Sequence, residues 1–70
     1  MSKRIELDKC TKCGRYPVMR FMELEGQPAV YYQCGCKISK RYIVHRRGSM
    51  ETPEMPGDAV RKAAISWMAK

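Results

Sequence analysis

The most regular hydrophobic pattern lies near the C-terminal end of the chain. Apolar side chains recur there at the spacing of one helix face, with polar and basic side chains between them: Val60, Ala63, Ala64, Trp67 and Met68. The pattern predicts a helix over residues 58–69, with Asp58 as the N-cap of its first turn. Because so short a helix is unstable alone in water, we expect it to pack on another element, with Trp67 as its largest apolar contact.

Three segments upstream of this helix have the composition of strands. Residues 18–24 are rich in large apolar side chains, residues 29–33 are β-branched and aromatic, and residues 38–44 continue that pattern. A turn is expected at residues 25–28, and a loop rich in Pro at residues 50–57. The prediction is an α+β fold, a three-stranded antiparallel sheet with the C-terminal helix packed on it.

The apolar residues of the first predicted strand fall on both of its faces. If the helix covers one face, a partner or a second copy covers the other, so both a monomer and a homodimer are compatible with the pattern. The chain has 70 residues, which leaves room for one domain, expected at residues 10–70 after a charged lead-in at residues 1–9. So small a domain buries only about 60% of its unfolded surface and usually needs a metal, disulfides or a partner.

The four cysteines are the strongest chemical signal in the sequence. Cys10 and Cys13 are separated by two residues, and Cys34 and Cys36 by one. No apolar stretch is long enough to cross a membrane, so we expect a cytoplasmic protein without membrane contacts, in a compartment where disulfides rarely persist. A hairpin between the pairs would bring four thiolates together around one Zn²⁺, in a closed structural site.

Other uses of the cysteines remain open at this stage. A disulfide, free buried thiols, an iron cluster and a redox Cys-x-x-Cys are the alternatives to zinc. The second pair is one residue shorter than usual, so His45, the one histidine of the chain, is the alternative ligand if both sulfurs cannot reach the metal. A four-sulfur zinc site has no open position for substrate, and no acid–base or nucleophile pair stands out, so we expect a binding protein that is not an enzyme.

The charge of the chain changes the expected partner. Lys and Arg number 14 against 7 Asp and Glu, a formal net charge of +7, which favours nucleic acid or an acidic protein surface. One stretch is basic throughout and carries the candidate nucleic-acid-binding residues, Lys37, Lys40, Arg41, Arg46 and Arg47. Three tyrosines lie close to it in sequence (Tyr31, Tyr32 and Tyr42), and they would either stack on bases or pack in the core.

These motifs resemble those of the Lar-type restriction-alleviation zinc-ribbon proteins of phages and prophages. The resemblance is carried by Cys10 to Gly14, by the strand that ends in Cys34 and Cys36, and by the terminal helix with Ala63 and Trp67. It implies a small accessory protein that binds a host macromolecule, namely a type I restriction-modification enzyme. A looser similarity to the Ogr/Delta activators of phage late genes, carried by Tyr32 to Cys34 and by Arg41 to Val44, implies binding to DNA and RNA polymerase.

Overall fold

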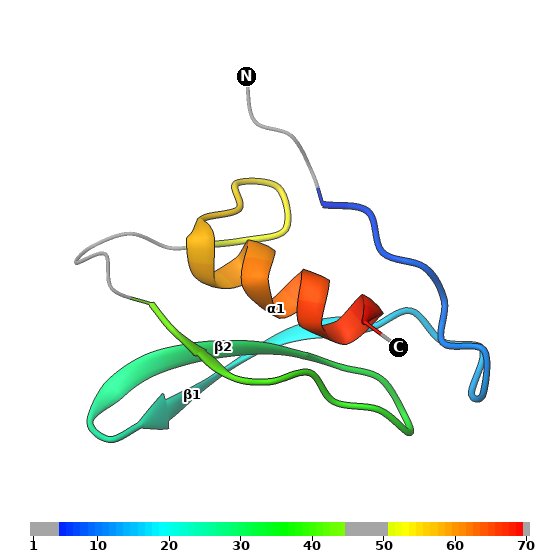
Figure 1. Cartoon of the computed structure of the whole chain (residues 1–70), viewed down its shortest axis with the longest axis horizontal. Coiled ribbons are helices and arrows are strands. Elements are labelled where there is room, and N and C mark those ends of the chain that lie inside the picture. The colour runs from blue at the N-terminus through cyan, green and yellow to red at the C-terminus, as the bar shows by residue number, and fades with distance from the viewer. Residues whose placement is uncertain (1–4, 45–50, 70) are drawn as a thin grey trace.

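The computed structural model describes residues 5–44 and 51–69. Its elements are β1 (Val18–Leu24), β2 (Gln27–Gln33), β3 (Tyr42–Ile43) and α1 (Asp58–Met68). The strands form one antiparallel sheet in the order β1-β2-β3, and α1 packs on β2 and β3, as Figure 1 shows. The predicted α+β fold is confirmed. Within the described residues, no helix has the length and apolar character needed to cross a membrane.

A two-residue turn joins β1 to β2. Both of its residues have positive φ, 52° at Glu25 and 78° at Gly26, which is the signature of a type I′ turn and matches the twist of a hairpin. The predicted turn over residues 25–28 was too long, because Pro28 lies inside β2 opposite Glu23. Proline fits there because it lies near the start of the strand and still accepts from Val44 N–H at 2.8 Å through its carbonyl.

Strand β3 is much shorter than the predicted segment of residues 38–44. Ile38 forms only an isolated bridge with Gln33, and the paired strand begins at Tyr42. The Ser39 hydroxyl accepts from the backbone N–H of Tyr32 at 2.9 Å, in place of a carbonyl of the ladder. Between the bridge and β3, three residues therefore oppose two residues of β2, which is a bulge that interrupts the strand.

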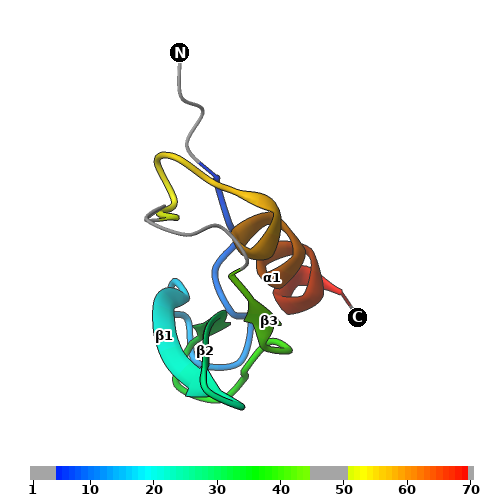
Figure 2. The same cartoon turned by 90° about the vertical axis from the view of Figure 1, so that its left-hand side faces the viewer.

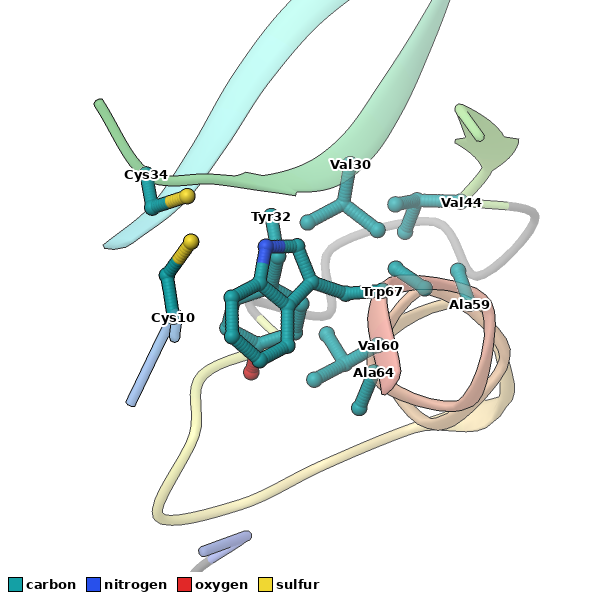
Figure 3. Close-up of a cluster of buried hydrophobic side chains, with 10 residues drawn as sticks. Cys10, Val30, Tyr32, Cys34, Val44, Ala59, Val60, Ala64 and Trp67 are labelled. Atoms are coloured by element: carbon teal, nitrogen blue, oxygen red, sulfur yellow. The ribbon is translucent and has the colours of Figure 1, made fainter. Parts of the chain in front are cut away.

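The hydrophobic core lies between β2 and the helix. Val30 and Tyr32 of β2 are both buried, and Val60 and Trp67 are the large buried side chains of α1, as Figure 3 shows. Three alanines complete the buried face of the helix: Ala59, Ala63 and Ala64. The predicted apolar stripe is confirmed up to Trp67, while Met68 is 40% exposed at the end of the helix.

The start of the helix is capped by a residue that is distant in sequence. The predicted N-cap Asp58 is exposed, the N-cap position is Gly57, and no side chain of the cap residue bonds to the helix. Instead the buried Glu51 carboxylate accepts from Val60 N–H at 3.0 Å, at the positive end of the helix dipole. A Cβ at Gly57 would lie 2.5 Å from Glu51 Oε1, so the carboxylate occupies the space beside this glycine.

Candidate metal centre

All four cysteines converge at one end of the hairpin. The Sγ atoms of Cys10, Cys13, Cys34 and Cys36 lie within 4.8 Å of one another, and those of Cys10 and Cys36 are 3.2 Å apart. In a tetrahedral zinc site, a Zn–S bond of about 2.3 Å places the sulfurs about 3.8 Å apart. The four cysteines therefore form a cluster suitable for a metal ion.

The hairpin is what brings the two pairs together. The first pair precedes β1 and Cys34 directly follows β2, so the antiparallel pairing of the strands returns the chain to its starting point. Gly14 N–H donates to the Cys10 carbonyl at 2.8 Å, and its φ of 70° closes the first turn. In the second turn, Cys34 N–H donates to the Lys37 carbonyl at 2.9 Å.

Backbone amides at the first turn favour the thiolate form of its cysteines. The Cys13 N–H, together with the Cys36 thiol and the Lys12 N–H, lowers the pKa of Cys10 to about 6. The Arg15 N–H lowers the pKa of Cys13. The hydrogen bond with Cys10 raises the pKa of Cys36 to about 12, because Cys36 keeps the proton that the two sulfurs share. Donors that stabilise a free thiolate also stabilise a metal-bound one.

The cluster is part of the core on one side and open on the other. Cys10 and Cys34 are buried in the cluster that contains Trp67, whereas Cys36 is exposed. The indole nitrogen of Trp67 is buried without a hydrogen-bond partner, and Figure 3 shows it on the edge of the ring nearest the sulfurs of Cys10 and Cys34. The end of α1 therefore covers the buried side of the cysteine cluster.

Three lysines surround the cysteine cluster at the surface. Lys9, Lys12 and Lys37 line a hollow of about 470 Å³ together with Cys10 and Trp67. Lys37 Nζ lies 5.2 Å from the centroid of the Trp67 ring and donates to the Ala69 carbonyl at 3.3 Å. Four thiolates around a divalent cation carry a net negative charge, so these lysines offset the charge of the cluster.

The structure describes three of the five predicted nucleic-acid-binding residues. Lys37 lies against the end of the helix, Lys40 donates its N–H to Ser66 Oγ at 3.1 Å, and Arg41 is exposed just before β3. Arg46, Arg47 and the alternative ligand His45 lie outside the described residues.

The tyrosines divide between the two faces of the sheet. Tyr32 is 1% exposed and Tyr42 packs against the core, so the expectation of core packing holds for these two. Tyr31 lies on the opposite face and pairs with Arg20, a residue that the sequence did not single out. Arg20 stands among apolar residues of β1, and only the strand register relates it to Tyr31.

The chain matches no protein-family model, no curated protein and no solved structure. Its residues show a four-cysteine cluster on a small three-stranded antiparallel sheet with a C-terminal helix, a zinc-ribbon-like α+β fold.

Proposed function

We propose that the cysteine cluster binds one Zn²⁺ and that this ion holds the fold together. The convergence of four sulfurs within 4.8 Å supports the proposal, because a set of four thiolates matches the ligand preference and tetrahedral geometry of structural zinc. Elemental analysis of the chain purified under reducing conditions should find one zinc per chain. Removal of the zinc by a strong chelator should convert the circular dichroism spectrum of the folded chain to that of an unfolded chain. A chain without stoichiometric metal and with an unchanged spectrum would contradict it.

The protein acts by binding a macromolecule and is not an enzyme. Four cysteine ligands fill a tetrahedral site and leave no position at which zinc could activate water. Among the carboxylates of the described residues, the buried Glu51 already accepts from the helix N-terminus. The convergence of the four sulfurs is thus the observation that supports a structural role for the metal.

The partner is a host macromolecule, and the cellular role is alleviation of type I restriction. The resemblance of the cysteine pairs and the terminal helix to Lar-type proteins supports this role. Unmodified phage plated on a type I restricting host should form more plaques when the chain is produced than when it is absent. A Cys34→Ser variant is the control, since it removes a ligand of the cluster. Equal plating with and without the intact chain would reject restriction alleviation.

A second candidate function is binding of nucleic acid. The observation that favours it is the exposure of basic side chains that sequence analysis selected, Lys37, Lys40 and Arg41, in a chain of net charge +7. Contacts with phosphates release counterions, so affinity should fall steeply as salt rises. Titration of the zinc-loaded chain with DNA and RNA oligonucleotides at about 50 mM salt tests this function, and absence of binding to either would reject it.

A further inference from the structure

The sheet has one face that the helix does not cover. Figures 1 and 2 show α1 and the loop of residues 51–57 on the same side of the sheet. We call the opposite side the outer face. Beyond the Leu24 and Gln27 pair next to the turn, the register places three further rows of side chains there, each crossing the strands: Met22, Ala29 and Ile43; Arg20 and Tyr31; and Val18, Gln33 and Ile38.

The middle row of the outer face combines an aromatic ring with positive charge. Tyr31 of β2 is half-buried and lies directly opposite the exposed Arg20 of β1. On its other side, Arg41 directly precedes β3 and belongs to the three-residue bulge that lies opposite Tyr31 and Tyr32. Arg41 is also exposed, so the position of Tyr31 on β2 is flanked by an arginine position on β1 and another just before β3.

The remaining positions of the outer face are apolar or uncharged. Val18 and Ile38 are 54% and 50% exposed, Ala29 is buried between Met22 and Ile43, and these rows contain no carboxylate. A surface with a ring, apolar side chains and two flanking arginines offers a base both a stacking partner and nearby positive charge for its phosphates. A duplex keeps its bases stacked on one another, so this chemistry selects single strands.

We propose that the outer face binds single-stranded nucleic acid, with Tyr31 stacking on a base and Arg20 and Arg41 contacting the backbone phosphates. This inference rests on nucleic-acid binding, the second candidate function above. Charge complementarity selects this occupant over a second copy of the chain. Two copies meeting at this face would bring their Arg20 and Arg41 groups together within a dimer of two chains that each carry +7.

The test compares variants of the ring and of the charges. Tyr31→Ile removes the ring but keeps a residue that favours strands, and Tyr31→Phe keeps the ring. Arg20→Gln and Arg41→Gln each remove one charge. Tyr16→Ile is the control for loss of an exposed aromatic ring, and Lys62→Gln is the control for loss of one charge on the exposed side of the helix.

The measurement is fluorescence anisotropy with a labelled oligothymidylate of about 12 nucleotides, a length within the usual site sizes. Each zinc-loaded variant is first checked for zinc content and circular dichroism. Tyr31→Ile should weaken binding by about 5- to 100-fold, while Tyr31→Phe should stay within about twofold of the unaltered chain. Arg20→Gln and Arg41→Gln should each reduce the slope of log K against log salt by about 0.7. Tyr16→Ile should bind the oligonucleotide with the affinity of the unaltered chain. Lys62→Gln should keep the slope of the unaltered chain, apart from the effect of a lower net charge.

The results that would contradict the proposal have different meanings. If the unaltered chain binds no oligothymidylate and no oligouridylate, nucleic-acid binding itself fails, and this site fails with it. If the unaltered chain binds and Tyr31→Ile binds equally well, the function stands and the outer face is the wrong site. Tighter binding of a duplex of the same sequence would also overturn the stacking role. A dimer in sedimentation that Tyr31→Ile dissociates, without change in oligonucleotide affinity, would assign the face to a second copy.

Discussion

Tyr31 and Tyr32 are neighbours in β2 and lie on opposite faces of the sheet. Tyr32 is 1% exposed beneath the helix, whereas Tyr31 is half-buried on the outer face between arginine positions. The covered face joins β2, the helix and the cysteine cluster into one core. On the outer face Ala29 is buried, but Arg20 and Val18 are exposed and Tyr31 is partly exposed, so these side chains are available for a ligand. Substitutions on the covered face should therefore change stability, and those on the outer face should change binding.

The largest effect is expected where the covered face meets the cysteine cluster. Cys34→Ser should abolish the folded state, because structural zinc contributes about 10 to 16 kcal/mol and a whole domain is stable by about 5 to 15 kcal/mol. Zinc content and circular dichroism provide the measurement, and Thr11→Ser, an exposed change inside the first turn, is the control. A Cys34→Ser chain that keeps full zinc and a native spectrum would show that the ion is not what holds the core.

A matched pair of valines compares the faces directly. Val30 is 0% exposed on the covered face and Val18 is 54% exposed on the outer face. Val30→Ala should lower the free energy of unfolding by about 2 kcal/mol, through lost burial and the cavity left behind, and Val18→Ala by less than about 1 kcal/mol. Denaturant unfolding of the zinc-loaded variants measures both. Equal losses at the two positions would mean that the outer face is covered in solution.

The sequence predicted the parts of this arrangement that depend on local spacing. The helix follows from the spacing of Val60 and Trp67, and the cysteine cluster follows from two close pairs joined by a hairpin. The sequence could not predict contacts between residues that only the fold brings together. Glu51 caps a helix that begins seven residues later, and Arg20 meets Tyr31 only through the strand register. The bulge after Ile38 depends on the Ser39 hydroxyl, which replaces a carbonyl of the ladder.

The cap at Glu51 orients the helix over the covered face. Glu51→Ala should lower the free energy of unfolding by about 1 to 2 kcal/mol, because the Val60 N–H loses its partner at the helix N-terminus. Glu54→Ala, an exposed change three residues later, should stay within about 0.5 kcal/mol of the unaltered chain. Denaturant unfolding separates the two variants. If both lose the same stability, the Glu51 carboxylate does not act as a cap.

Proton release on zinc binding tests whether the first cysteine turn forms before the metal arrives. The pKa of Cys10 lies at about 6, below its ordinary 9.0, so its thiolate stabilises the metal-free turn fully above about pH 9, and this contribution declines as the pH falls from 9 to 6 and is absent below 6. Zinc binding at neutral pH should therefore release fewer than four protons from the four cysteines, and the number should rise toward four below pH 6.

Calorimetry in buffers of different ionisation enthalpy measures the number of protons released. Four protons at neutral pH would show that the backbone amides of Cys13 and Lys12 do not stabilise the Cys10 thiolate without metal. The first cysteine turn would then form together with the zinc site and not before it.

The smallest expected effect on stability comes from removing the hydroxyl group of each of the two adjacent tyrosines. The Tyr32 hydroxyl is buried without a hydrogen-bond partner, and burial raises its pKa. Tyr32→Phe removes this desolvated polar group and should therefore raise the free energy of unfolding by up to about 1 kcal/mol. Tyr31→Phe should change it by less than about 0.5 kcal/mol, since Tyr31 is only half-buried. Unfolding by denaturant under identical zinc concentrations measures both variants. A loss of stability in Tyr32→Phe would mean that an ordered water or another partner forms a hydrogen bond with this hydroxyl beneath the helix.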